Sequence, residues 1–482
     1  MVAKNDGTLV IVILRLTAID PMALSFIGSN WSGHCILPDA GVAIAVPTAA
    51  PVDWLPDGKC VLMVVVGGAF TQLLADDNLL YTVGNNAHGQ LGRGHVGNSD
   101  PDNRVPRPVT GFGLERITQI AAGDSHCAAV TEGGKLFLWG LNASGQCGTG
   151  VASGHVITAS RCDSGALADA DVRVVYVACG GIHTVALASD GGVIAFGGNT
   201  FGQLGTGSND DTPTPERLSC AALVGAGIVG CAAGGNFTQL VSDDGRVYAV
   251  GLNVCGQLGT GDMTSVNTPT AIDAAHFGGA PVAAVACGYC HTLAITRGEG
   301  RVFCWGRGTH GATGLVHTGD AATPRPVVGA LADARVVRMC AGNSHSCALT
   351  EDGRVFVFGS GVGITVAGNH GTPQVLQEGA LAGTTVRALG AGCRGTHAAF
   401  LAGPPPTAPG FEAPLAYALQ KKPAPKVPKH AAAAAAVVAA AAAQSSGGGA
   451  ASAGSGQGTK RKRGDQSDDD DSGAHGEGSN DL

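Results

Sequence analysis

A single glycine that recurs at nearly constant spacing constrains the fold of this chain more than any other feature. The successive spacings are 56, 56, 57, 54, 55 and 53 residues, and the glycine stands at Gly28, Gly84, Gly140, Gly197, Gly251, Gly306 and Gly359. Self-similarity with a period of this length is typical of solenoids and propellers, in which each repeat is one small supersecondary unit. The sequence therefore predicts seven structural units of one kind.

Each repeat carries two short motifs. The recurring glycine belongs to the second motif, aromatic-Gly-x-Asn-x-x-Gly-Gln-Leu-Gly, which is clearest at residues 83–92. In two copies of the first motif, small-small-Gly-x-x-His, phenylalanine replaces histidine, at Phe70 and Phe237. The other copies of the first motif end at His126, His183, His291, His345 and His397, and the last of them is two residues longer than the rest.

The segments between the motifs alternate apolar and polar residues and are joined by Asp-Gly turns, as at 242–246 and 350–354. This pattern indicates β-hairpins, because both turn residues tolerate positive φ. The 77 glycines and a charged fraction of only 14% also suit many short strands. Each repeat is expected to be a sheet of about four strands, which buries both faces when the sheets pack radially. The predicted fold class is an all-β, seven-bladed β-propeller.

The two ends of the chain predict how the ring closes. The chain opens with a second motif, at 24–34, that has no first motif before it, and the last first motif, within 386–402, has no second motif after it. Pairing the N- and C-terminal strands would build one composite blade and leave no exposed sheet edge at the joint. We expect this propeller to span residues 22–402.

Both motifs, their order and their number resemble the repeats of the regulator-of-chromosome-condensation family, and the resemblance covers roughly residues 23–402. It implies a seven-bladed ring closed by mixed terminal strands. The family's founding member is a chromatin-bound exchange factor for the GTPase Ran, and other members are scaffolds, ubiquitin-ligase parts, a plant ultraviolet receptor and secreted inhibitors. Because one fold serves several functions, the function has to be argued from the variable positions.

In this fold the two variable residues of Gly-x-x-His are expected to surround the mouth of the central channel. The expected partner-binding residues there are Asp124, Ser125, Asn236, Tyr289, Cys290, Asn343, Ser344 and Arg394. Exchange factors of the family that this chain resembles place acidic residues and a histidine at these positions around the channel mouth, where they contact the GTPase. Asp124 matches that pattern, whereas Ile182 and Cys290 stand where an acid and a histidine are expected. Such factors also carry an inserted β-wedge. In this chain the spacing from Gly140 to Gly197 leaves no room for a wedge beyond an ordinary connector, although residues 147–170 could form a reshaped loop of that kind.

Other candidate chemistry is weaker. The recurring histidines are expected to be structural, since Phe70 and Phe237 replace two of them. Cys287 and Cys290 lack a second ligand pair, so no metal is expected, and the fifteen cysteines are expected to be reduced. No catalytic triad, phosphate-binding loop or cofactor motif stands out, so no cofactor and no covalent catalysis are expected. A light sensor would need clustered tryptophans, and this chain has four in all.

The regions outside the repeats have a different character. Residues 403–482 are low-complexity sequence, expected to be disordered, and contain the basic run Lys460, Arg461, Lys462 and Arg463, which is typical of a nuclear localisation signal. Residues 1–21 match no repeat and stay unassigned, so translation could begin at Met1 or at Met22. Their apolar run, 9–14, is too short for a membrane span.

The charge distribution completes the sequence-based hypothesis. Residues 403–482 contain eight basic and eight acidic side chains, so the net charge of −8 lies on the propeller. An acidic ring favours a basic protein surface over DNA, which leaves any DNA contact to the tail. We therefore expect a monomeric nuclear protein that binds a Ran-like GTPase as a candidate exchange factor, with histones or chromatin and a nuclear import receptor as further partners. The alternative is a non-catalytic scaffold of the same family.

Overall fold

The computed structural model of this chain describes residues 10–15, 23–28, 60–316, 319–360, 371–376, 386–395 and 397–402. Every regular element within them is a β-strand or a 3₁₀ helix of three or four residues, so the predicted all-β class is confirmed. None of the described helices is long and apolar enough to span a membrane. The expected nuclear localisation signal, 460–463, and the rest of 403–482 lie outside the described residues.

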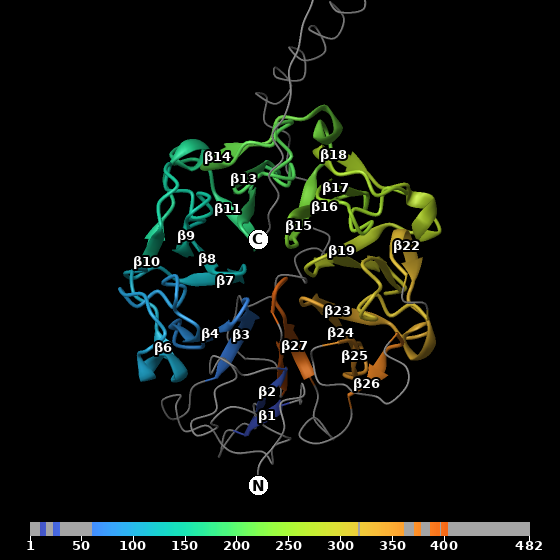
Figure 1. The fold of residues 1–482 in the computed structure, drawn as a ribbon, viewed down its shortest axis with the longest axis horizontal. Helices are drawn as coiled ribbons and strands as arrows, with labels where there is room; N and C mark the ends of the chain where they lie inside the picture. The colour runs from blue at the N-terminus through green and yellow to red at the C-terminus, as the bar shows by residue number, and fades with distance from the viewer. Residues whose placement is uncertain are drawn as a thin grey trace, which may run out of the picture. The chain divides into compact units, whose positions relative to one another are not determined.

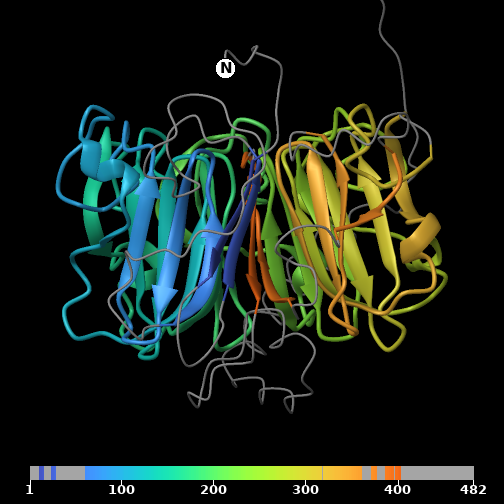
Figure 2. The ribbon, with the colours of Figure 1, turned by 90° about the horizontal axis from the view of Figure 1, so that it is seen from below.

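The strands form seven four-stranded antiparallel sheets that stand around a common axis as a β-propeller (Figure 1). The strands run roughly along that axis (Figure 2). Six sheets use four consecutive strands each. The seventh combines strands from both ends of the chain in the order β1-β2-β28-β27, and we call it the closing sheet.

In each of the six consecutive sheets, the first strand is the innermost of the ring. These inner strands are β3 (Val61–Val66), β7 (Ile117–Ala122), β11 (Val174–Cys179), β15 (Ile228–Ala233), β19 (Val282–Cys287) and β23 (Val336–Ala341). The second strands are β4 (Phe70–Ala75), β8 (His126–Thr131), β12 (His183–Ala188), β16 (Phe237–Ser242), β20 (His291–Thr296) and β24 (His345–Thr350).

The third strands begin the outward half of each sheet. They are β5 (Leu80–Gly84), β9 (Leu136–Leu141), β13 (Val193–Gly197), β17 (Val247–Gly251), β21 (Val302–Gly306) and β25 (Val355–Gly359). The outer strands are β6 (Arg107–Pro108), β10 (His155–Arg161), β14 (Thr212–Arg217), β18 (Val266–Ala271), β22 (Ala321–Pro326) and β26 (Gln374–Val375). The 3₁₀ helices lie in the connections and are η1 (Pro101–Arg104), η2 (Gly165–Leu167), η3 (Ala221–Leu223), η4 (Ala274–Phe277) and η5 (Gly329–Leu331).

The closing sheet joins the two ends of the chain as the sequence predicted. Strand β2 (Ala23–Gly28) pairs antiparallel with β28 (His397–Ala402), with Leu24 opposite Leu401, and β28 also pairs with β27 (Val386–Gly390). The structure adds one strand that the sequence left unassigned. Strand β1 (Val10–Arg15) lies within residues 1–21 and pairs with β2, so a chain starting at Met22 would lack the outer strand of this sheet.

The recurring glycine is explained by a close approach between two strands. Gly197 ends β13 opposite His183 and has a φ of 106°, a backbone conformation that side chains rarely adopt. A Cβ atom added there would lie 2.8 Å from the Ile182 carbonyl oxygen. Only glycine meets both requirements at low cost, which accounts for the repeat that organises the sequence.

The hydrophobic core lies between adjacent sheets rather than within one layer. Aromatic side chains before the recurring glycine cross these interfaces, and Trp139 and Trp305 are fully buried. The indole nitrogen of Trp139 donates a hydrogen bond of 3.1 Å to the carbonyl of Gln90, in the second motif of the preceding sheet, and Trp305 bonds Gln257 in the same way at 2.9 Å. Each repeat is therefore stabilised mainly by its neighbours.

Candidate partner-binding face at the channel mouth

Two sets of loops meet on one face of the ring. The turns between first and second strands carry the variable residues of the first motif, and the loops after the third strands carry the second motif. The two are joined directly, because the backbone NH of Leu141 donates to Ser125 (2.8 Å) and that of Leu252 donates to Asn236 (2.9 Å). We call this surface the mouth face. It surrounds one end of the central channel.

Backbone hydrogen bonds between neighbouring turns fix the centre of the mouth face. Gly68 donates to the carbonyl of Asp124 (3.2 Å), Gly235 donates to that of Tyr289 (3.2 Å), and Asn343 donates to that of Gly395 (3.0 Å). These bonds link turns that belong to different sheets. The side chains at the mouth are therefore presented from a mutually braced ring of turns.

The structure brings most of the predicted residues to this face. Arg394 is exposed, and the side chains of intermediate exposure are Asp124, Ser125, Asn236, Tyr289, Asn343 and Ser344. Cys290 differs from the prediction, since it is only 4% exposed. Burial raises the pKa of the Cys290 thiol to about 11, so it is a protonated interior group rather than a surface contact.

An ion pair crosses the mouth and was not foreseen from the sequence. Arg394, between β27 and β28, donates from Nη1 to Oδ2 of Asp124 at 2.7 Å and from Nη2 to the hydroxyl of Tyr289 at 3.1 Å. The guanidinium carbon also lies 4.8 Å from the centroid of the Tyr289 ring. Burial lowers the pKa of Arg394, but the hydrogen bond and the charge of Asp124 outweigh it, and the pKa rises above its ordinary value. The single acid that matched the family pattern is thus already paired.

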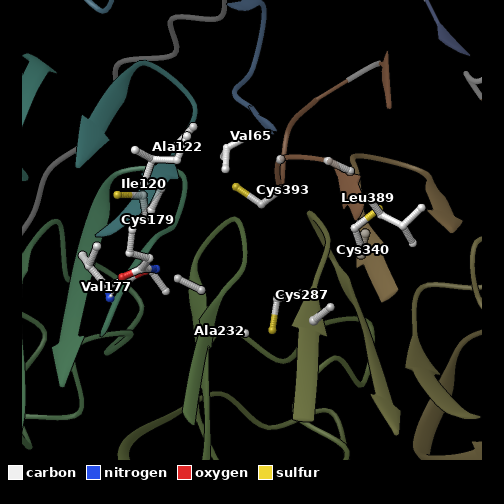
Figure 3. Close-up of a pocket in the computed structure, with 18 of the residues that line it drawn as sticks. Val65, Ile120, Ala122, Val177, Cys179, Ala232, Cys287, Cys340, Leu389 and Cys393 are labelled. Atoms are coloured by element: carbon white, nitrogen blue, oxygen red, sulfur yellow. Dashed lines mark hydrogen bonds between the residues drawn. The ribbon is translucent and has the colours of Figure 1, made fainter. Parts of the chain in front are cut away.

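The channel beneath the mouth contains a cavity of about 230 Å³. Figure 3 shows cysteines from several sheets around it, and the thiols in the lining are Cys179, Cys231, Cys287, Cys340 and Cys393. Burial raises the pKa of Cys393 to about 12 and raises that of Cys287 well above its ordinary value. The Cys287 and Cys393 thiols are therefore protonated at neutral pH and behave as small apolar side chains. Within the described residues, no group of three or more His, Cys, Asp or Glu side chains converges on a metal position.

The histidines of the first motif link neighbouring sheets. His183 is fully buried, and its Nε2 lies 3.0 Å from the hydroxyl of Thr238, which itself donates to the carbonyl of Gln203 at 2.8 Å. Because that hydroxyl proton is used, His183 must donate from Nε2. His126 bonds Thr184 in the same way, and His291 bonds Ser346. The side chain of His397 lies outside the described residues.

Burial holds these histidines neutral. It lowers the pKa of His126 and His345 to about 4, and that of His183 and His291 to about 3, with a further contribution to His183 from nearby His126. At His126, His183 and His291 the neutral imidazole donates to a hydroxyl of the next sheet and so contributes packing and hydrogen bonding.

Exposed apolar side chains lie on five of the second-motif loops around the mouth, and sequence reasoning missed them. The second-motif loops present Val96, Val151, Phe201, Val254, Met263 and Val316. Phe201 and Val254 occupy variable positions just before Gly-Gln-Leu-Gly, where an apolar residue is out of place in a solvated loop. These two apolar residues were the sequence signal that could have indicated exposed apolar side chains on this face. On the opposite face, the exposed large apolar side chains of the described residues are Leu79, Leu114 and Val224.

Residues 147–170, the one segment that the sequence analysis considered as a reshaped wedge-like loop, form the same connection as in the other sheets. It contains β10, which pairs with β9 as the outer strand of its sheet, followed by η2. Gly94 in the preceding sheet donates to the carbonyl of Ile157 at 2.9 Å, and equivalent bonds tie Gly207 to Asn267 and Gly261 to Ala322. The segment therefore repeats the connection seen in the other sheets.

Comparison with known proteins identifies the family. The model of the RCC1-like domain matches residues 23–400, which include both repeat motifs and all the turns of the mouth face. The chain belongs to the RCC1-like domain family. Ultraviolet-B receptor UVR8 of Arabidopsis thaliana is 30% identical over 326 residues, which cover 67% of this chain and 71% of UVR8. The human probable E3 ubiquitin-protein ligase HERC3 is 35% identical over 224 residues, 46% of this chain and 20% of HERC3.

Solved structures of other proteins share the fold. Human WBSCR16 has a TM-score of 0.64 and 25% identity, and the match covers 79% of this chain and 98% of that structure. Prp20p of Saccharomyces cerevisiae, described with its binding properties to Gsp1p and histones, has a TM-score of 0.67 and 19% identity over 80% of this chain and 93% of Prp20p. This RCC1-like domain thus has relatives with several different roles.

Proposed function

We propose that this chain is a seven-bladed nuclear interaction propeller that binds a Ran-like small GTPase through its mouth face and acts as a guanine nucleotide exchange factor. Membership of the RCC1-like family supports this function, as does the fold shared with Prp20p, whose reported binding to Gsp1p and histones extends the proposal to chromatin. The basic run at 460–463 supports nuclear import through an import receptor.

The observation that carries the proposal is the makeup of the mouth face. The mouth face combines a polar centre, which includes Asp124 and Tyr289, with exposed apolar side chains on the loops around it, among them Phe201, Val254 and Val316. Exposed apolar side chains on the same face as a braced polar centre offer a partner protein both apolar area to bury and polar groups to contact. Exchange needs no covalent chemistry here. A propeller that binds the nucleotide-free GTPase more tightly than the loaded one shifts the equilibrium toward nucleotide release.

The test measures release of a fluorescent GDP analogue from the organism's own Ran-like GTPase, with catalytic amounts of the full chain. We expect the full chain to accelerate release. Replacing Phe201 and Val254 together by serine should reduce the acceleration about tenfold, because truncating apolar anchors in an interface is costly. The matched control replaces Leu114 and Val224 by serine, since both are exposed on the opposite face.

The outcomes separate the two proposed functions. Acceleration that the mouth-face variant loses and the opposite-face variant keeps establishes exchange through this face. Saturable binding of the GTPase without faster release would favour the scaffold, which the varied relatives UVR8 and HERC3 also support. If the GTPase neither binds nor releases nucleotide faster, the proposed partner is wrong.

A further inference from the structure

Arg394 occupies a site that is built to hold a cation. Its guanidinium has a carboxylate on one side, from Asp124, and an aromatic ring with a hydroxyl on the other, from Tyr289. A carboxylate and an aromatic face are the two side-chain types that bind guanidinium and ammonium groups most strongly. These two groups come from different sheets, between β7 and β8 and between β19 and β20.

Hydrogen bonds to neighbouring turns hold the backbones of the two acceptor residues. The carbonyl of Asp124 accepts a bond from Gly68, and Tyr289 is bonded on both sides, accepting from Gly235 and donating to Gly342 (3.3 Å). The Tyr289 ring also packs directly on Gly235, where an added Cβ atom would lie 2.6 Å from the ring. The backbones of Asp124 and Tyr289 are therefore fixed by contacts that do not involve Arg394.

The cation itself is held less firmly. The Arg394 side chain is 44% exposed and the Asp124 side chain is 26% exposed, so water screens their attraction. Ion pairs of this exposure contribute little to stability, and a long flexible arginine side chain can leave the site by changing rotamer. A cation presented by another protein can make the same contacts in its place.

We propose that Arg394 is an internal competitor, and that the Asp124–Tyr289 site binds an arginine or lysine side chain of a partner protein once Arg394 swings out. The acidic propeller, with a net charge of −8 outside residues 403–482, favours approach of such a basic surface. This inference deepens the proposed function and takes the partner's identity from it, while the cation site itself stands on the geometry at the mouth.

The first experiment tests the site without any GTPase. The probe is a fluorescently labelled peptide, Gly-Gly-Arg-Gly-Gly, and its control is the same peptide with citrulline, which keeps the shape of arginine but lacks the charge. We expect the full-length Arg394→Gln variant to bind the arginine peptide at least fivefold more tightly than the wild-type chain does. Binding should vanish with the citrulline peptide and in the Arg394→Gln, Asp124→Asn double variant.

The second experiment measures affinity for the Ran-like GTPase in the same variants. Arg394→Gln should tighten binding and Asp124→Asn should weaken it, so the two members of one ion pair should have opposite effects. If both variants weaken GTPase binding equally, Arg394 is a direct contact or a structural support, and the competitor role is wrong. An unchanged unfolding midpoint of Arg394→Gln keeps that comparison free of folding effects.

The two experiments fail separately. If the Arg394→Gln variant binds the arginine peptide but no variant binds the GTPase, the cation site holds and the proposed partner is wrong. If the variant binds arginine and citrulline peptides alike, or neither of them, the cation site is refuted regardless of what the GTPase does.

Discussion

The interface between two consecutive sheets and the interface that reaches the closing sheet solve the same packing problem differently. Between the sheets of β12 and β16, His183 donates to Thr238, and Thr238 donates to the carbonyl of Gln203. At the closing sheet, His345 occupies the equivalent position, but the residue that would receive its bond is Ala398. Among the described residues, neither ring nitrogen of His345 has a hydrogen-bond partner.

Other contacts hold the closing sheet to its neighbours. Arg387 donates from Nη2 to the carbonyl of Val61 at 2.7 Å, Asn343 donates to Gly395, and Phe400 and Ala398 pack fully buried with Cys347 and Val357. The consecutive interfaces that contain His126, His183 and His291 thus use a buried neutral hydrogen-bond chain, whereas the closing sheet relies on backbone pairing, packing and an arginine. The same residue type therefore makes a hydrogen bond at His183 and none at His345, because Ala398 offers no hydroxyl group.

Acid should have the largest effect, because it acts on every buried histidine together. Each of these histidines has a pKa of about 3 or 4 in the folded chain and near 6.5 when unfolded, so below pH 6.5 the unfolded chain binds more protons. The contribution of these histidines to the free energy of unfolding is therefore fully present above pH 6.5. It falls as the pH approaches 4, by about 1.4 kcal/mol per pH unit for each histidine. Urea midpoints at pH 7.5 and pH 5 measure this loss, and equal midpoints would contradict it.

Replacing histidine by phenylalanine should separate the two kinds of interface. His183→Phe removes the donor to buried Thr238 and should destabilise the chain by about 1 kcal/mol, the typical net value of one hydrogen bond. His345→Phe removes two unpartnered nitrogens and should leave stability unchanged or raise it by up to about 1 kcal/mol. Phe70 and Phe237 show that the fold accepts this side chain. Equal losses in the two variants, from chemical unfolding at pH 7.5, would remove the distinction.

The smallest effect should come from supplying the missing hydroxyl. Ala398→Ser introduces at the closing sheet the group that Ser346 provides to His291. We expect a gain of about 0.5–1 kcal/mol at pH 7.5, since a buried donor acquires an acceptor. The gain should disappear when Ala398→Ser is combined with His345→Phe, which gives a double-mutant cycle. A gain that persists in the double variant would have to come from something other than this hydrogen bond.

The sequence predicted the architecture because one small unit is repeated. The glycine spacing, the Asp-Gly turns and the offset of the two motifs are local signals, and together they define sheets, connections and the pairing of β2 with β28. The sequence did not reveal β1, because residues 10–15 match no repeat and pair only through β2. A strand outside the repeat leaves no periodic signal.

The candidate site was predictable only in part for a related reason. The motif placed Asp124, Tyr289 and Arg394 on one ring, since each follows the same glycine in its turn. Their mutual contact depends on how far Arg394 reaches across the mouth, and no sequence spacing encodes that distance. The burial of Cys290 was likewise set by its packing near Cys255, a residue of the adjoining second-motif loop.

The pairing of β2 with β28 also sets the order of events during synthesis. Leu24 lies opposite Leu401, so one edge of β2 has no partner until nearly the whole repeat region has left the ribosome. Consecutive sheets can form as they emerge, but the nascent chain keeps an open strand edge at its beginning for most of translation, and such edges recruit other chains. A messenger RNA truncated within the last repeat would therefore encode an incomplete propeller with an open, aggregation-prone strand edge, rather than a smaller closed ring.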